Sequence, residues 1–354
     1  MIAAFDIPVT KVDRSRLSDT PLENLPFGRF FTDHMLEAEY ADGEWKSVQI
    51  RPYQALSLEP SLAALHYGQA IFEGIKAYRD AEGNAFIFRP FDNFKRFNTS
   101  AARMNMPEVP EEIFMEGMRK LIALDKNWIP AIKDHSLYIR PFMFATDTML
   151  GVRPSATYKF LIILSPSGPY FAAPMKILVE EHYTRAAPGG VGFAKNAGNY
   201  GGSMLAVTEA QKQGYDQVLW TDAVEHKWLQ EVGMMNVFFI LNGVAVTPSL
   251  EEGTILHGVT RDSVLVVLKE MGIPVEERRI NIDELLAAYG KGQLQEVFGT
   301  GTAAVIAMVK ELKYKEFQMT FNVDNSPIAK AVKERLTAIR EGKAEDLHQW
   351  MWKV

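Results

Sequence analysis

Apolar residues recur along this chain with two spacings, and each spacing predicts a different kind of element. Intervals of three and four residues favour amphipathic helices, whereas short apolar runs or loose alternation favour strands. Helices are predicted over 92–104, 111–124, 202–213, 260–271, 282–289 and 327–340. Strands are predicted over 137–144, 159–164, 176–181, 217–221, 227–231, 236–241, 244–247, 296–298 and 305–309.

Turn-forming residues mark three hairpins. Asn242-Gly243 stands between two predicted strands and is the strongest short hairpin signal in the chain. A second turn at 41–43 divides the loosely alternating stretch 31–50, and a third at 81–84 joins 75–78 to 85–88. Residues 1 to about 27 are polar and punctuated by proline, which predicts an arm that packs on the body of the protein.

Length and turn signals together predict two domains. A chain of 354 residues is longer than one hydrophobic core usually supports. The run Ser-Pro-Ser-Gly-Pro-Tyr at 165–170 lies between two predicted strands, so an interdomain linker is expected at 166–175. We therefore expect a smaller N-terminal domain at 1–165 and a larger domain at 176–354 that carries Lys195. The mixture of hairpins and helices gives the fold class α+β.

Composition excludes several kinds of chemistry. The net charge of −6, without a lysine and arginine block, argues against nucleic acid as a partner. The absence of cysteine excludes disulfides, thiolate zinc sites and cysteine nucleophiles. The histidines, among them His34, His66 and His257, lack metal-ligand spacing, so no metal site is expected. Apolar runs such as 160–164 are too short to span a membrane, and no secretory signal is visible, so a cytoplasmic enzyme is expected.

The stretch 191–204 places one lysine, Lys195, among small residues and glycines, with Tyr200 five positions later. A lysine that only solvates a surface rarely has such cramped surroundings. A lysine that must deprotonate and bond to a carbonyl carbon does, because desolvation and neighbouring groups lower its pKa. The stretch therefore points to a nucleophilic lysine.

Two glycine-containing segments are candidate anion sites. The segment 299–303 follows a predicted strand and fits a loose dinucleotide fingerprint, but a strand follows it where that fold requires a helix. A tight turn there could instead grip a phosphate or carboxylate. The segment 257–263 opens a helix, and two interpretations are equally supported: an ordinary N-cap by Thr260, or a helix start that holds a phosphate.

Three charged residues have both an ordinary and a functional interpretation. For Arg96 and Arg140 the ordinary interpretation is a surface arginine, which is the usual case. Arg140, however, stands inside an apolar strand-like run at 137–142, and a buried arginine needs an anion or another partner. Glu231 ends a predicted strand and is either a solvated carboxylate or a site residue.

Taken together, these segments resemble the fold-type IV pyridoxal-phosphate enzymes, and among them the branched-chain amino-acid aminotransferases. The likeness extends from about residue 27 to Trp350-Met351-Trp352. The resemblance implies the two-domain architecture of that family. The motifs that carry it, in chain order, are 31–35, 65–74, 138–141, 195–200, 231–236, 258–261 and 299–303.

The resemblance implies pyridoxal 5′-phosphate as the cofactor and assigns its contacts. Lys195 would bind the cofactor covalently and then act as the base that moves the substrate α-proton. Glu231 would keep the pyridine nitrogen protonated, and Tyr200 would hydrogen-bond the 3-oxygen of the ring. The phosphate would be bound by Arg96, by the backbone N–H groups of Val259 and Thr260, and by the Thr302 hydroxyl.

The resemblance also implies a substrate site. The backbone of Thr302 and Ala303, with Tyr138 and Arg140 nearby, would receive the substrate carboxylate. Arg140 is in addition the candidate contact for the far carboxylate of glutamate. The walls for a branched aliphatic side chain would be aromatic: Phe27, Tyr67, Phe72 and Tyr170.

The loop at Leu150 and Val152 matches one that reaches the neighbouring subunit in this family, so the resemblance implies a homodimer. The implied reaction moves an amino group between L-leucine, L-isoleucine or L-valine and 2-oxoglutarate. The alternatives are another fold-type IV enzyme, such as a D-amino-acid aminotransferase or an aminodeoxychorismate lyase, or a non-catalytic binding protein on this fold. The intact Lys195 and Glu231 oppose the last of these.

Two positions depart from the mammalian members of the family. Met234 stands where those relatives have a threonine that helps to bind substrate. Ala304 and Ala307 stand where they have a pair of cysteines that acts as a redox switch, so thiol regulation of that kind is not expected here.

Overall fold

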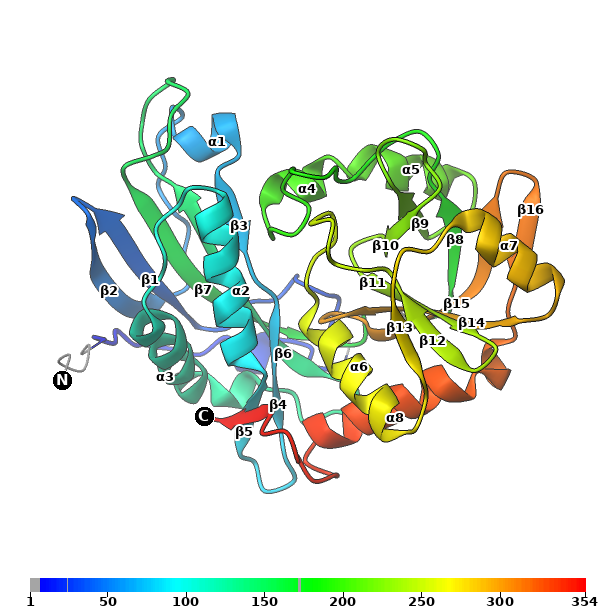
Figure 1. The fold of residues 1–354 in the computed structure, drawn as a ribbon. Coiled ribbons are helices and arrows are strands. Elements are labelled where there is room, and N and C mark those ends of the chain that lie inside the picture. The colour runs from blue at the N-terminus through cyan, green and yellow to red at the C-terminus, as the bar shows by residue number, and fades with distance from the viewer. Residues whose placement is uncertain (1–6, 24, 171–172) are drawn as a thin grey trace. The chain divides into compact units, whose positions relative to one another are not determined.

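The computed structural model describes residues 7–23, 25–170 and 173–354, and the chain divides into two compact units (Figure 1). The first unit comprises Met1–Tyr170, Ala194–Ala197 and Ile339–Val354, and the second comprises Phe171–Phe193 and Gly198–Ala338. Two segments expected in the C-terminal domain, Lys195 with its neighbours and the stretch after residue 338, therefore group with the first unit. The reason is strand pairing: Asn196 bridges Ile71, and a strand near the C-terminus joins the first sheet.

The described part of the first unit is built on one sheet of eight strands. The order is β17-β5-β4-β6-β7-β1-β2, with β3 also paired to β6. All of these pairs are antiparallel, and the two hairpins predicted at 41–43 and 81–84 are confirmed as β1–β2 and β4–β5. The strands are β1 (His34–Ala41), β2 (Glu44–Pro52), β3 (Ala70–Phe72), β4 (Ile75–Arg79), β5 (Ala85–Phe88), β6 (Ser136–Ala145), β7 (Tyr158–Ser167) and β17 (Met351–Lys353).

Helices α2 and α3 lie against this sheet (Figure 1). Phe97 of α2 meets Phe160 of β7 edge to face, and Phe114 stacks on it, at ring-centroid distances of 5.5 and 5.7 Å. A Cβ at Gly117 would lie 2.9 Å from the Leu36 side chain, so the glycine lets the helix approach β1 closely. The helix predicted at 111–124 begins as a π-helical turn. The helices are α1 (Ala63–Tyr67), α2 (Pro90–Arg103), the π-helix Glu112–Glu116 and α3 (Gly117–Leu124).

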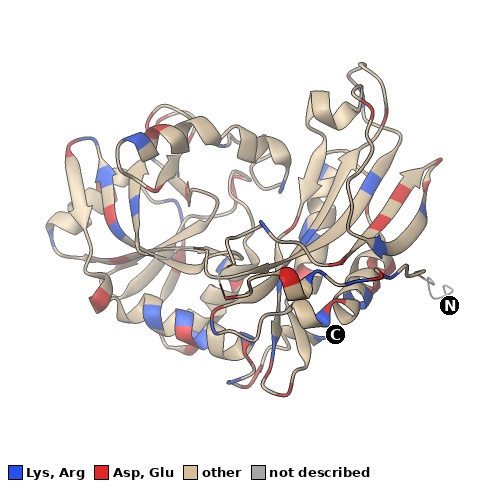
Figure 2. Ribbon diagram, turned by 180° about the vertical axis from the view of Figure 1, so that it is seen from behind, with Lys and Arg blue, Asp and Glu red and all other residues tan. Residues whose placement is uncertain are grey.

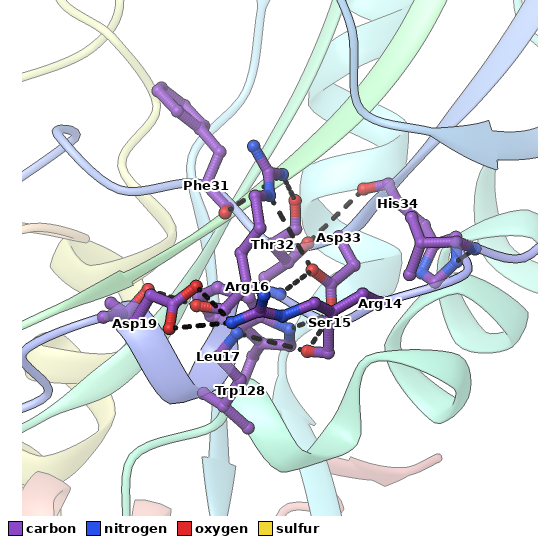
Figure 3. Close-up of polar contacts among 12 residues, drawn as sticks. Arg14, Ser15, Arg16, Leu17, Asp19, Phe31, Thr32, Asp33, His34 and Trp128 are labelled. Carbon is purple, nitrogen blue, oxygen red and sulfur yellow. Dashed lines mark hydrogen bonds and ion pairs between the residues drawn. The ribbon is translucent and has the colours of Figure 1, made fainter.

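The described residues before β1 form an arm on this unit, as predicted, and Asp33 fastens it (Figure 3). The Asp33 carboxylate accepts hydrogen bonds from Ser15 Oγ at 2.5 Å, the Arg16 backbone N–H at 2.9 Å and Trp128 Nε1 at 2.8 Å. Farther along, Val9 bridges Ile50. A single buried carboxylate thus organises a segment that has only the short 3-10 helix Leu17–Asp19 of its own.

The described part of the second unit is built on a mixed sheet of nine strands. The order is β10-β9-β8-β15-β14-β11-β12-β13, with β16 paired to β15. Strand β8 pairs in parallel with β9 and β15, and β12 pairs in parallel with β13. The strands are β8 (Met175–Val179), β9 (Gln217–Thr221), β10 (Leu229–Val232), β11 (Asn236–Leu241), β12 (Val244–Thr247), β13 (Val275–Glu277), β14 (Leu294–Gly301), β15 (Val305–Tyr314) and β16 (Phe317–Thr320).

The hairpin at Asn242-Gly243 is confirmed, with φ of 50° and 78° at the two turn residues, as a type I′ turn requires. The helix predicted at 327–340 is also confirmed, and the Glu296 carboxylate accepts hydrogen bonds from the N–H groups of Ile328 and Ala329 in its first turn. The helices of this part of the chain are α4 (Ala197–Gly201), α5 (Met204–Lys212), α6 (Val259–Glu270), α7 (Ile282–Gly290) and α8 (Pro327–Arg340).

Helices and sheets of both kinds confirm the α+β class, and two local expectations are corrected. The expected linker begins too early, because β7 continues through Ser167, which is buried. The helix expected at 202–213 is confirmed as α5, and the short helix α4 precedes it. Gly299 and Thr300 belong to β14 rather than to a turn, because they pair with Ala307 and Ile306 of β15.

Acidic and basic residues are interspersed along the elements of each unit in the view of Figure 2. Within the described ranges, no helix combines the length and the apolar character that a membrane span requires.

Candidate active site

The backbone of Lys195 is held on both sides by the first unit. Its N–H donates to the buried Ser100 Oγ of α2 at 2.9 Å, and its carbonyl accepts from the Phe72 N–H at 3.0 Å. The neighbouring Asn196 bridges Ile71 of β3. The Lys195 ammonium lies 4.9 Å from the centroid of the Phe72 ring. These contacts fix the point from which the lysine side chain leaves the backbone.

A fully buried carboxylate lies next to this segment. Glu73, directly after Phe72, accepts hydrogen bonds from Arg96 Nε at 2.7 Å and Nη2 at 2.8 Å, and from Asn93 Nδ2 at 2.8 Å. Burial raises the pKa of Glu73, but the charge and hydrogen bonds of Arg96, then the charge of Lys195, hold it below its ordinary value. Arg96, predicted to bind phosphate, is thus oriented by a bidentate ion pair.

Five of the predicted substrate residues form one cluster in the first unit, which we call the aromatic group: Phe27, Phe72, Tyr138, Arg140 and Tyr170. Phe27 meets Tyr138 and Tyr170 edge to face, with centroids 4.8 and 5.0 Å away. The Arg140 guanidinium lies 4.6 Å from the Phe72 centroid and donates to the Tyr138 hydroxyl at 2.9 Å. Arg140 Nε is buried and has no hydrogen-bond partner among the described residues. The group combines an apolar wall with a cation that can still accept an anion.

Three further predicted substrate residues of the first unit have exposed side chains. Tyr67 ends the short helix α1 and is exposed. Leu150 and Val152, on the connection between β6 and β7, are 68% and 88% exposed. Large apolar side chains with that exposure form no part of the core of this chain.

In the second unit, Glu231 is buried on β10 and paired with Arg185. Its Oε2 lies 2.8 Å from Arg185 Nη2, and its Oε1 accepts the Leu256 N–H at 2.8 Å. The same arginine nitrogen also donates to the carbonyls of Gly192 and Thr254, at 3.1 and 2.9 Å. The ion pair fixes the position of the Glu231 carboxylate, and the carbonyls fix the direction of Arg185.

The start of α6 is built around a glycine. Gly258 is the N-cap residue and has no side-chain cap, so Thr260 is the second helical residue and the N-cap interpretation of Thr260 is wrong. A Cβ on Gly258 would lie 2.0 Å from Asn236 Oδ1, and Asn236 in turn donates to the Leu256 carbonyl at 2.9 Å. Val259 and Thr260 thus form the first turn of a helix whose N-cap residue has no side chain.

The remaining predicted site residues lie on short connections. Thr302 and Ala303 form the turn between β14 and β15, and Tyr200 lies on α4. Just before that turn, Thr300 Oγ1 is buried without a hydrogen-bond partner among the described residues. An orphaned buried hydroxyl usually indicates a missing ligand or water.

The second unit's own chemistry fits the phosphate and the ring of the expected cofactor. A helix start whose N-cap residue is a close-packed glycine suits a phosphate. The buried carboxylate of Glu231, positioned by an arginine, suits a protonated ring nitrogen. The donors found here are N–H and O–H groups, as an anionic ligand requires.

Sequence reasoning missed two residues that organise these sites, Glu73 and Arg185. Glu73 belongs to the motif 65–74, and its signal was a charged residue directly before a glycine inside an apolar run. Arg185 carries no such signal, because its partner Glu231 is 46 residues away in sequence and meets it only through folding.

Comparisons with known proteins agree with one another. Residues 70–312 match the model of the family described as amino-transferase class IV. The chain is 50% identical over 349 residues to a probable branched-chain-amino-acid aminotransferase of Staphylococcus epidermidis, covering 96% of this chain and 97% of that protein. It is 48% identical to branched-chain-amino-acid transaminase 1 of Bacillus subtilis, covering 94% of each.

Among solved structures, the chain resembles a T.th. branched-chain amino acid aminotransferase complexed with N-(5′-phosphopyridoxyl)-L-glutamate. The TM-score is 0.70 at 27% identity, and the match covers 89% of this chain and 97% of that one.

Proposed function

The chain belongs to the class IV aminotransferases and, within them, to the branched-chain amino-acid aminotransferases, and on this premise we propose how its residues carry the reaction. The reaction is transfer of an amino group between L-leucine, L-isoleucine or L-valine and 2-oxoglutarate. The observation that carries the proposal is the aromatic group. There the Arg140 guanidinium lies against aromatic rings, and its buried Nε has no hydrogen-bond partner among the described residues. That combination serves both an aliphatic side chain and a second carboxylate.

We propose pyridoxal 5′-phosphate as the cofactor, which when bound supplies a ring that accepts electron density from the substrate α-carbon. The structure of the T.th. relative in complex with a phosphopyridoxyl compound supports this choice. Lys195 would hold the cofactor, Glu231 would face its ring nitrogen, and Tyr200 would face its 3-oxygen. The phosphate would be held by Arg96, Val259, Thr260 and Thr302.

Lys195 Nζ would take the proton from the substrate α-carbon and deliver it to C4′ of the cofactor within the same half-reaction, and the second half-reaction would run this transfer in reverse. Efficient proton transfer needs a base whose position relative to the substrate is fixed. The contacts of its backbone with Ser100 and Phe72 supply that. Glu73 adds a negative charge near the lysine, because its own pKa responds to Lys195.

For the substrate, the backbone of Thr302 and Ala303 would bind the α-carboxylate, together with the Tyr138 hydroxyl. Leucine, isoleucine and valine would be selected by burial against Phe27, Phe72 and Tyr170, and by Tyr67. A pocket of this kind discriminates about 10- to 200-fold for one methylene. Arg140 would pair with the far carboxylate when glutamate or 2-oxoglutarate binds.

Assembly as a homodimer in the cytoplasm forms part of the proposal. The exposed Leu150 and Val152 support it, because large apolar side chains in open solvent are typical of an interaction surface. Substituting both by Ser should shift the protein toward monomer in sedimentation velocity, and an unchanged sedimentation coefficient would contradict this use of the loop.

The substrate assignment is tested by the colour of the purified enzyme. With cofactor bound, it should absorb in the visible range, and L-leucine should bleach that band while D-alanine should not. Bleaching by D-alanine alone would replace the assignment by a D-amino-acid aminotransferase. Protein that cannot be reconstituted with the cofactor would contradict the catalytic interpretation altogether.

A further inference from the structure

One face of the β4–β5 hairpin gathers cations that the proposed reaction does not use. Lys76 and Tyr78 are two residues apart on β4, so both side chains point to the same face. Arg340, the last residue of α8, covers this face, with its guanidinium 4.1 Å from the centroid of the Phe88 ring on β5. All of these residues belong to the first unit.

Arg340 is buried without the partners that a guanidinium needs. The residue is 4% exposed, and it donates a hydrogen bond to the Tyr78 hydroxyl. Its Nε and Nη1 atoms are buried and have no hydrogen-bond partner in the ranges that the structure describes, where no carboxylate pairs with it either. A buried charge with unused donors is costly, so such a group usually has a counter-ion.

The surrounding charges are mostly positive. Lys76 is 7% exposed, and burial followed by the charge of Arg340 lowers its pKa to about 7. Arg89 acts on Arg340 with a further positive charge, although Arg89 is itself paired with Asp92 at 2.8 Å. The acid that acts on Tyr78, Glu341, is paired with Lys343 at 2.5 Å. The local excess of positive charge is therefore not cancelled by these groups.

We propose that Lys76, Tyr78 and Arg340 bind one small monovalent anion of the halide class, chloride under ordinary conditions. The three residues offer N–H donors, an ammonium group and a phenolic O–H. The Tyr78 oxygen accepts a hydrogen bond from Arg340, so the Tyr78 O–H is left to donate to the anion. Burial has the largest effect on the pKa of Tyr78 and raises it, which keeps the phenol protonated. A monatomic anion suits this place because the site is nearly closed to solvent and walled on one side by the Phe88 ring.

Protonation of Lys76 is thermodynamically linked to this binding. The charged form binds the anion more tightly, so the anion raises the pKa of Lys76 from about 7, and halide affinity falls as the pH rises through that value. Of the other groups that face the anion, Tyr78 keeps its proton near neutral pH because burial raises its pKa, whereas burial lowers the pKa of Arg340, an effect that a bound anion opposes.

Crystals of the holoenzyme grown or soaked in bromide test the proposal directly. We expect an anomalous bromine peak within hydrogen-bonding distance of Arg340 Nε or Nη1. Arg340→Gln and Lys76→Met should both lose the peak. Lys76→Met keeps the test valid if Arg340→Gln does not fold, because it replaces a buried charge by an apolar side chain of similar length. Arg335→Gln, an exposed arginine on the same helix, should keep it.

In solution, unfolding midpoints in sodium chloride and in sodium gluconate of equal ionic strength provide the second readout. At ten times the dissociation constant, the halide should raise the folding equilibrium constant about tenfold, less at pH 8 than at pH 6, and only in proteins that keep the site. A water at Arg340 in bromide crystals would overturn the proposal. So would a peak that survives Lys76→Met, or occupancy by an oxyanion in place of bromide.

Discussion

Replacing Glu73 by Gln removes a negative charge from the interior of the first unit while keeping the volume of the side chain. Glu73 is 0% exposed and receives two hydrogen bonds from Arg96 and one from Asn93, at 2.7 to 2.8 Å. A glutamine has one acceptor oxygen, and its amide N–H₂ would face donors. The substitution therefore removes the carboxylate that pairs with the buried guanidinium of Arg96.

The cost follows from the class of interaction. Removing one partner of a buried, hydrogen-bonded ion pair destabilises a protein by about 3–5 kcal/mol. We expect a loss of this size for Glu73→Gln, equivalent to a fall of about two to four orders of magnitude in the folding equilibrium constant. Because the pKa of Glu73 is lowered in the folded protein, its contribution is present above its ordinary value of 4.5 and is lost as the pH falls through the folded value. The difference from the unsubstituted protein should therefore shrink in acid.

Urea unfolding of the cofactor-free protein at pH 7 measures this, with the slope compared as well as the midpoint. Glu116→Gln is the matched control, since its pair with Arg119 is about half exposed and should contribute less than about 1 kcal/mol. Adding Arg96→Met to Glu73→Gln should recover part of the loss, because both charges are then absent. A Glu73→Gln protein as stable as the Glu116→Gln control would refute the reasoning, and so would strictly additive losses in the double variant.

Three further outcomes are expected. Lys195→Ala should still bind the cofactor noncovalently but lose at least about 10²- to 10⁴-fold in turnover, measured at steady state with L-leucine. Asp222→Asn should cost about 1–2 kcal/mol of unfolding free energy at pH 7 in urea titrations. Burial raises the pKa of Asp222, but hydrogen bonds from four backbone N–H groups outweigh it and lower the pKa to about 2. This stability is present above pH 3.8 and is lost as the pH falls toward 2, where the variant should be as stable as the parent. Gly258→Ala should weaken cofactor binding in reconstitution titrations, because its Cβ would lie 2.0 Å from Asn236 Oδ1, whereas Gly290→Ala, with no atom within 4 Å of the added carbon, should not.

Elements with a local cause could be predicted from the sequence. The helix α8 was predicted with the bounds that it has, because its apolar stripe and its initial proline lie within the segment itself. The turn at Asn242-Gly243 required only two residues that tolerate positive φ. Strands β13, β16 and β17 were missed because three or four residues are too few to show a period. In addition, β13 and β17 are held by partners that are distant in sequence.

In the candidate site, too, some features could be predicted from the sequence and others could not. Residue types at motif positions, such as Lys195 and Glu231, could be assigned roles by resemblance, and those roles stay predictions. The partners that orient such residues could not be assigned, because Arg185 and Glu73 act through contacts made by folding. The pairing of the buried cations Lys76 and Arg340 could not be predicted either, since the two residues lie 264 positions apart and no sequence pattern indicates that they come together.

The pairing of β17 with β5 has a consequence for synthesis of the chain. The sheet of the first unit cannot be completed until residues 351–353 have emerged from the ribosome, although its other strands end at Ser167. At about 5–20 residues per second, translating the intervening stretch takes roughly 10 to 40 s. Throughout that interval, the apolar edge Phe86-Ile87-Phe88 lacks its final partner. During this interval a chaperone would have to cover the exposed edge of the nascent chain. Otherwise the free edges of two chains translated from one messenger RNA would pair with each other.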